Sequence, residues 1–225
     1  SFLKVRLIRN RRRKRLSIMV DRSGISVISP VNEDIVTIRN FINHNNPWIL
    51  KKTKFYAKLN NKLDYSPLQK DEIIYLGKKY KMKFVKDTFQ YTVLSENLMK
   101  ITFHVNDRRT YNRNIINWYR EQTKKLLENK VPFFGKMLSI SYGKVGVRSQ
   151  KLRWGSCSKK GNLNFNLLLS ALPMNIIDYI IIHELFHLVE FNHSNHFWKI
   201  VEDAFPSYKY CRAWLKKNGA YLQFH

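Results

Sequence analysis

Four of the seven histidines in this chain of 225 residues lie within 14 positions, from His183 to His196. Two of them, His183 and His187, fall with Glu184 inside an almost wholly apolar segment, residues 175–191, which is typical of a buried helix. Polar side chains in such a helix are costly unless a partner satisfies their polarity. The alternative to a bound partner is a pair of core histidines with Glu184 as their counter-ion.

The spacing of the two histidines indicates that the partner is a metal ion. His183 and His187 are four residues apart, so both imidazoles lie on one helix face, about 6 Å apart along the axis. Glu184 is displaced sideways toward a water on the ion, as in the His-Glu-x-x-His arrangement of zinc peptidases. Zinc lowers the pKa of this water to about 7, and the carboxylate takes its proton. The pattern therefore predicts one zinc or other divalent ion, with Glu184 as general base.

A catalytic zinc ion needs a third protein ligand and an open position. His193 can fold back to the ion if the helix ends near Asn192, a residue type that tolerates a left-handed turn. A carboxylate from Glu202 or Asp203 on the next helix is the main alternative. We expect His196 to contact the substrate or a neighbouring ligand rather than the ion.

The polar loop at residues 148–160 supplies the candidate substrate contacts. Arg153 could face a developing oxyanion or a phosphate of the substrate, with Trp154 beside it. An equally good interpretation is a packing loop in which Trp154 is buried and Arg153 pairs with an acid. Cys157 is expected to be a small buried residue, because no base is identifiable near it.

A series of motifs that extends over nearly the whole chain resembles one family. Its main members are Arg153-Trp154-Gly155-Ser156-Cys157-Ser158, Gly161-x-Leu163-x-x-Asn166, Leu172-Pro173, Asp178-Tyr179-x-x-x-His183-Glu184-Leu185-x-His187 and Asn192-His193-Ser194-x-x-Phe197-Trp198. In this order they are similar to the YgjP-like family, bacterial proteins described as predicted metal-dependent hydrolases and related to SprT-like zinc metallopeptidases. The resemblance implies His183, His187 and His193 as zinc ligands and Glu184 as base. It leaves the substrate open.

The chain carries a large excess of positive charge, 41 Lys and Arg against 16 Asp and Glu. The excess is spread over the chain: residues 1–60, 61–140 and 141–225 carry +11, +8 and +6. The densest run, residues 11–15, lies between two apolar alternations, which favours a hairpin turn over a flexible basic arm. Such a surface attracts anionic substrates and allows nonspecific contact with nucleic acid.

The hydrophobic pattern predicts an α+β organisation, with strands dominating early and helices late. We expect strands before residue 30, a helix capped by Asn32, a second helix from Pro47 and four antiparallel strands between residues 72 and 105. Further elements are expected as a helix over 114–129, strands over 138–147 and 163–169, a helix begun by an Asn175–Asp178 capping box, and helices to the end. The pattern places a boundary near residue 106 or 135, and the family resemblance implies a zincin-like C-terminal domain. The predicted division is a β-rich basic portion with a helical pair, residues 1–106, and a zincin-like hydrolase domain, residues 107–225.

Composition restricts the class of protein further. Aromatic residues make up 14% of the chain, more than a disordered chain carries. Two cysteines make no disulfide framework and favour a reducing compartment. No apolar run approaches the ~20 residues of a membrane span, and the N-terminus lacks the apolar stretch of a signal peptide. We therefore expect a cytoplasmic protein without a membrane partner.

Three functions compete at this stage. The first is a zinc hydrolase of peptide bonds, with residues 163–169 as an edge strand for an extended peptide. The second keeps the metal but acts on nucleotides or other phosphorylated substrates, because Arg148, Lys151, Arg153, Lys159 and Lys160 surround the loop motif. The third is a nucleic-acid-associated protease, which predicts binding with a steep salt dependence.

Overall fold

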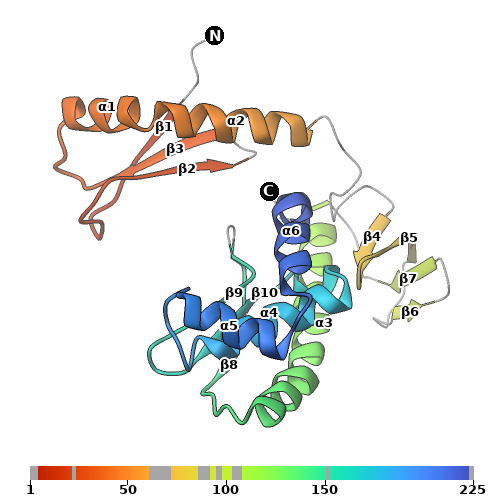
Figure 1. The fold of residues 1–225 in the computed structure, drawn as a ribbon. Coiled ribbons are helices and arrows are strands. Elements are labelled where there is room, and N and C mark those ends of the chain that lie inside the picture. The colour runs from red at the N-terminus through yellow and green to blue at the C-terminus, as the bar shows by residue number, and fades with distance from the viewer. Residues whose placement is uncertain are drawn as a thin grey trace. The chain divides into compact units, whose positions relative to one another are not determined.

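The computed structural model describes residues 5–21, 24–60, 72–85, 92–94, 98–102, 108–150 and 153–222. The chain divides into two compact units, Ser1–Tyr65 and Ser66–Phe224, and the predicted boundary at residue 106 falls inside the second unit. Helices and small sheets are combined in the chain, which confirms the predicted α+β class (Figure 1). No helix within the described ranges is long and apolar enough to span a membrane.

The first unit is a three-stranded sheet with two helices. Strands β1 (Val5–Arg9), β2 (Ser17–Asp21) and β3 (Gly24–Ser29) have the order β1-β3-β2, and β1 pairs with β3 in parallel. The basic run at residues 11–15 is therefore not the turn of a hairpin, as predicted, because β3 lies between the two strands that it connects. Hairpin pairing from the sequence assumed that neighbours in sequence are neighbours in the sheet.

Two helices complete this unit. Helix α1 (Ile35–His44) is capped by Asp34, whose carboxylate accepts hydrogen bonds from the amides of Val36 and Thr37, so the cap predicted at Asn32 is wrong. Helix α2 (Asn46–Asn60) carries Pro47 in its first turn as predicted, and it packs on β2 and β3. A small core of Val20, Ile25 and Ile49 fills the contact.

The second unit begins with a four-stranded sheet formed by β4 (Glu72–Tyr75), β5 (Lys78–Val85), β6 (Thr92–Leu94) and β7 (Leu98–Thr102). The order is β4-β5-β7-β6, and β5 pairs with β7 in parallel, so the prediction of an all-antiparallel set is wrong. The β4–β5 turn binds the segment before the histidine helix, because the amides of Leu76 and Gly77 donate to the carbonyls of Ser170 and Ala171.

Helix α3 (Arg108–Leu138) is much longer than the predicted helix over 114–129, since it continues through Pro132 and Gly135. A proline inside a helix removes one hydrogen bond, but here its neighbours Val131 and Phe134 are buried in the main core. The helix ends where Ser139 adopts a positive φ of 56° and the amide of Ile140 donates to the carbonyl of Gly135. The predicted strand over 138–147 is thus shortened to β8 (Val145–Arg148).

The last sheet contains β8, β9 (Gly155–Cys157) and β10 (Leu163–Asn166) in the order β8-β10-β9. Strand β10 is parallel to β8 and antiparallel to β9, and it lies between them. The segment predicted as an edge strand is therefore the central strand, and β8 and β9 are the two edges. Helix α4 (Met174–Phe186) packs against β9 and α3, and helices α5 (Asn195–Ala204) and α6 (Tyr208–Asn218) pack on α4.

Candidate metal centre

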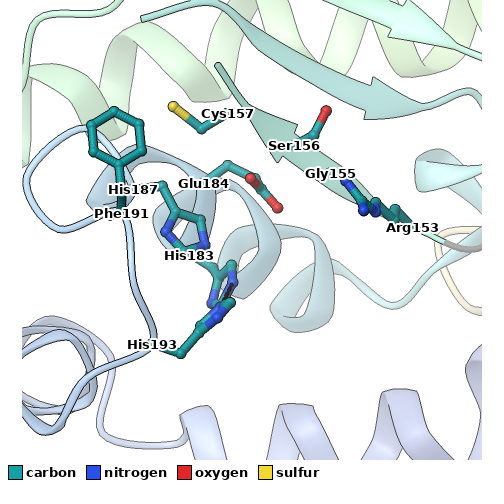
Figure 2. Close-up of a pocket in the computed structure, with 9 residues that line it drawn as sticks. All are labelled: Arg153, Gly155, Ser156, Cys157, His183, Glu184, His187, Phe191 and His193. Atoms are coloured by element: carbon teal, nitrogen blue, oxygen red, sulfur yellow. Dashed lines mark hydrogen bonds between the residues drawn. The ribbon is translucent and has the colours of Figure 1, made fainter. Parts of the chain in front are cut away.

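Three histidine side chains converge at the end of α4 (Figure 2). His183 lies in the last turn of α4, His187 is the residue that caps its C-terminus, and His193 belongs to the link before α5. One ligand atom from each imidazole lies within 4.8 Å of the others, and the Nε2 atoms of His183 and His193 are 3.0 Å apart. The structure thus brings together the three histidines that the sequence singled out.

The route to His193 differs from the predicted one. Helix α4 ends at Phe186 rather than near Asn192, and two tight turns follow it. Asn192 does not adopt the left-handed turn expected of it, since Leu76 and Ser139 are the only described residues besides glycine with positive φ. Instead, the carboxylate of Glu190 accepts a hydrogen bond from the amide of Asn192 at 3.1 Å. This contact and the Ser194 cap of α5 bracket His193.

Two hydrogen bonds orient the imidazoles on α4. Nδ1 of His187 lies 3.1 Å from the carbonyl oxygen of Glu190, which can only accept, so this Nδ1 carries the proton. Nδ1 of His183 lies 3.4 Å from the hydroxyl of Tyr179. In the neutral ring with Nδ1 protonated, Nε2 holds the free lone pair. The free lone pair of neutral His187 is therefore on Nε2, and Nε2 is the atom of His183 that faces His193. Neither outer partner was assigned a role from the sequence.

The donor set fits a divalent metal ion such as zinc. Zinc in proteins is bound by imidazole nitrogens at about 2.0–2.1 Å in tetrahedral geometry, which holds ligand nitrogens about 3.4 Å apart. The 3.0 Å separation of the His183 and His193 nitrogens is close to this spacing. Burial, followed by the charges of His187, His193 and Arg212, lowers the pKa of His183 to about 3, so the ring remains neutral and able to bind a cation.

An aromatic bed supports the three imidazoles. The fully buried ring of Phe197 stacks on His187 at 4.7 Å and meets His183 and His193 edge-on at 5.0 Å each. The ring of Trp198 stacks on His193 at 5.3 Å, and the guanidinium of Arg212 lies 4.0 Å above Trp198. Helix α5 thus holds the three histidines through its first turn. The adjacent Phe-Trp pair, four and five residues after His193, was the sequence signal for this bed.

Glu184 lies directly beneath the edge strand β9. Glu184 as a whole residue is only 6% exposed, and a Cβ added to Gly155 would meet its Cδ at 2.7 Å and its Oε1 at 2.6 Å. Position 155 therefore has to be glycine for β9 to approach the carboxylate this closely. Burial raises the pKa of Glu184 to about 8, and the guanidinium of Arg153 acts in the opposite direction.

A pocket of about 450 Å³ opens over these groups. Its lining combines the metal-centre residues with the edge strand and two flanking side chains: Arg153, Gly155, Ser156, Cys157, His183, Glu184, His187, Phe191 and His193 (Figure 2). Arg153 is exposed at one end of β9, and Cys157 stands at the other end. The Cys157 thiol is half-buried in the pocket wall, and burial followed by the Glu184 charge raises its pKa.

None of the remaining sequence candidates lines this pocket. Trp154 lines a neighbouring one of about 230 Å³, together with Arg153, Tyr179, His183 and Glu184. His196 is exposed in the first turn of α5 and lines neither pocket. The rival ligand Glu202 is bound at 2.7 Å by Lys209, and Asp203 is exposed and outside the cluster of possible ligands.

An α+β chain with three converging imidazoles and a buried glutamate beside them is a metal-dependent hydrolase of the metallopeptidase type. A family model described as the YgjP-like metallopeptidase domain matches residues 14–218. The chain therefore belongs to the YgjP-like family, which confirms the resemblance in its motifs. No match is found among curated proteins. Among solved structures, the chain is similar to the metallopeptidase zymogen abylysin of Pyrococcus abyssi, with 26% identity over 44% of this chain and 99% of that chain and a TM-score of 0.39.

Proposed function

We propose that this chain is a zinc-dependent peptidase in which His183, His187 and His193 hold the ion and Glu184 is the general base. The observation that carries this proposal is the convergence of three imidazoles beside a buried carboxylate in one open pocket. A zinc ion bound there supplies Lewis acidity, which polarises a carbonyl group and lowers the pKa of water. Glu184 accepts the proton of the attacking water and delivers it to the leaving amine.

The open edge of β9 suits an extended peptide substrate. In the antiparallel pair, the amide of Ser158 donates to Asn162 and the amide of Asn166 donates to the Trp154 carbonyl. Bonding alternates along a strand, so Gly155 and Cys157 direct their N–H and C=O groups away from β10, toward the pocket side. A peptide paired there would pass over Glu184. Arg153, at the end of the same strand, is placed to meet negative charge on the substrate.

The phosphorylated-substrate alternative has weaker support from the pocket. Of the cations that motivated it, Arg153 lines the pocket, whereas Lys159 and Lys160 are exposed in the β9–β10 turn. Arg148 lies on the opposite edge strand, β8, and Lys151 is outside the described residues. Among the described residues, Arg153 is therefore the one cation of this set in the pocket. A bound triphosphate normally meets several donors and a helix N-terminus.

The test combines metal analysis with substrate screening. We expect about one zinc ion per chain by mass spectrometry, and cleavage of a denatured-protein or peptide library that chelation abolishes. Glu184→Gln should keep the zinc and lose about 10²–10⁴-fold in rate, because it removes only the base. The matched control Glu202→Gln changes an exposed carboxylate on α5 and should retain both zinc and activity.

Two results would count against the proposal. Zinc-loaded protein that cleaves no peptide but releases phosphate from nucleoside triphosphates would move the function to the second hypothesis. Glu184→Gln with unchanged peptide hydrolysis would remove Glu184 as base, whatever the metal content.

A further inference from the structure

The β8 edge of the last sheet is open as well, on the side opposite the metal centre. The amide of Leu163 donates to the Lys144 carbonyl, and the amide of Leu167 donates to the Arg148 carbonyl. In a parallel ladder, these two bonds imply that the backbone groups of residues 144, 146 and 148 are the ones that bond to β10. Val145 and Val147 therefore direct their N–H and C=O groups away from the sheet. Within the described residues, no further strand pairs with this edge.

An apolar groove of about 300 Å³ runs between this edge and helix α3. Its walls are Val145 and Val147 of β8, Tyr142 before it, and Leu127, Val131 and Pro132 of α3. Leu127 and Val131 belong to the main core, whereas Val145 is 38% exposed, so the groove has a rigid floor and an accessible rim. An open strand edge beside a helix, with an apolar pocket between them, is the geometry of strand addition: backbone bonds give affinity and the pocket accepts alternate side chains.

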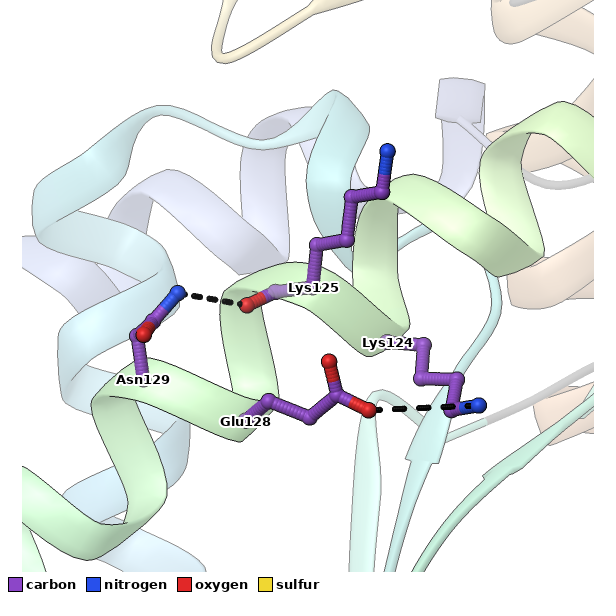
Figure 3. A network of polar contacts seen from close by, with 4 residues as sticks. All are labelled: Lys124, Lys125, Glu128 and Asn129. Atoms are coloured by element: carbon purple, nitrogen blue, oxygen red, sulfur yellow. Dashed lines mark hydrogen bonds and ion pairs between the residues drawn. The ribbon is translucent and has the colours of Figure 1, made fainter.

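The charged side chains of the groove lining are Lys124 and Glu128, one of each sign. Lys144 and Arg148 flank Val145 and Val147 in the sequence and point to the other face of the sheet, where Nε of Arg148 lies 3.4 Å from Oδ1 of Asn164. Glu128 is the one acidic residue of the lining, and Figure 3 shows its ion pair with Lys124. The carboxylate and the ammonium group of this pair are 3.9 Å apart. Both side chains of this pair are more than half exposed. A strand added to the β8 edge would place its own side chains opposite Lys144 and Arg148, so negative charge at its two ends would meet opposite charge there.

We propose that the β8–α3 groove binds an extended peptide segment of a partner protein, with apolar side chains at alternate positions and acidic residues at its ends. This inference goes beyond the proposed function, because it uses none of the metal-centre residues. Antiparallel pairing with a second copy of the chain, centred on Gly146, would place Lys144 opposite Arg148 of that copy. Like charges directly opposite are destabilising, so the charges on β8 oppose self-pairing and favour an acidic partner.

The test measures binding of two labelled octapeptides by fluorescence anisotropy, in the full chain carrying Glu184→Gln so that neither peptide is cleaved. Both contain Val-Thr-Val-Thr, flanked by two acidic residues at each end in one and by two lysines in the other. Val145→Pro removes the outward N–H and leaves the bonds to β10 intact. We expect this variant to bind the acidic peptide at least about tenfold more weakly, as expected for the loss of a backbone bond and the fit around it.

A charge variant keeps the test decisive if the proline disturbs the strand. Lys124→Glu combined with Lys144→Glu should weaken binding of the acidic peptide by about tenfold or more and should improve binding of the lysine-flanked peptide. The matched control, Lys216→Glu with Lys217→Glu, makes the same change in net charge at the end of α6, where both lysines are exposed. It should leave both affinities within about twofold.

Three outcomes would overturn the proposal. The acidic peptide could fail to bind at millimolar concentration, or both groove variants could bind it as the parent does. Sedimentation could also show a dimer that Val145→Pro dissociates while no peptide binds, which would assign the edge to a second copy of the chain. None of these outcomes depends on zinc or on hydrolysis, so the proposed function is tested separately.

Discussion

In the part of the chain that the structure describes, no further strand pairs with either edge of the sheet of β8, β10 and β9, and the surroundings of these two edges differ in kind. Beside β9 lies a polar pocket with three imidazoles and a buried carboxylate; beside β8 lies an apolar groove whose charged residues are Lys124 and Glu128. Both edges expose alternate backbone groups in the same way. The strand backbone therefore provides a general means of holding an extended chain. The helix that packs beside each edge determines whether the bound chain meets catalytic groups, as proposed at β9, or only an apolar surface, as at β8.

The largest effects on stability and zinc binding are expected from the buried side chains beneath the two sites. Phe197→Ala removes a fully buried ring and should cost about 3–5 kcal/mol of unfolding free energy. Leu127→Ala, in the floor of the β8 groove, should cost about 2–5 kcal/mol by the same mechanism. Phe197 also stacks on His187, so of the two variants only Phe197→Ala should weaken zinc binding. Urea unfolding and competition with a chelating dye measure the two effects, and equal zinc loss in Leu127→Ala would show that destabilisation is the cause.

The two edge strands each contain a glycine, which gives a matched pair. A Cβ at Gly155 would lie 2.5–2.7 Å from three atoms of the Glu184 side chain, whereas at Gly146 it would meet the end of the Asn164 side chain at 2.8 Å. Asn164 can turn aside, whereas a shift of Glu184 would displace the general base of the proposed function. We expect Gly155→Ala to lower kcat/KM for peptides by about 100-fold, as for a displacement of about 1 Å in a catalytic group.

Gly146→Ala should change kcat/KM by less than about twofold, and both variants should keep their zinc. Full activity in Gly155→Ala would contradict the assigned place of Glu184 beneath β9.

Local pattern was sufficient to find the candidate ligands, because all three lie within eleven residues of one another and two share a helix face. It was not sufficient to find Gly155, which is 29 residues from the carboxylate that it contacts. The same limit explains the errors in the sheets. The insertion of β3 between β1 and β2 and the parallel pairing of β5 with β7 are contacts between distant segments, and periodicity carries no information on them.

Element boundaries failed where tertiary contacts overrode local preference. Pro132 predicted a helix end, but burial of Val131 and Phe134 carries α3 past it to Leu138. The apolar run after His187 predicted a longer α4, but the helix ends at Phe186, and Nδ1 of His187 donates to the carbonyl of Glu190, three residues further on. The contacts of Val131 and Phe134 join distant segments, whereas the bond of His187 is local but does not follow from the apolar pattern.

A pair of tyrosines offers the next comparison. The hydroxyl of Tyr179 lies 3.4 Å from Nδ1 of His183, and Tyr142 lines the groove beside β8. Loss of an outer partner of a metal-binding histidine typically costs 10–100-fold in affinity. We expect Tyr179→Phe to weaken zinc binding by about tenfold, at the lower end because the bond is long. Tyr142→Phe should leave it unchanged, and a dye competition assay that finds both variants equal to the parent would remove Tyr179 as a positioning residue.

The smallest effect is expected at the rim of the β8 groove. Two lysines of α3 form ion pairs: Lys130 with Asp178 of α4 at 2.7 Å, where both side chains are less than a quarter exposed, and Lys124 with Glu128 at 3.9 Å, where both are more than half exposed. Water and salt screen the exposed pair, so Lys124→Ala should change the free energy of unfolding by less than about 0.5 kcal/mol. Lys130→Ala leaves the Asp178 carboxylate half-buried without its cation and should cost about 1–2 kcal/mol.

Urea unfolding at low and at high salt distinguishes the two lysines of α3. Equal costs for Lys124→Ala and Lys130→Ala would mean that Lys124 is part of the structural support of the helix. A negligible change in the free energy of unfolding for Lys124→Ala would mean that the fold does not depend on the ion pair between Lys124 and Glu128. Only in that case can the Lys124 ammonium group leave Glu128 for an acidic ligand at little expense, which is the condition that the β8 groove must meet to bind one.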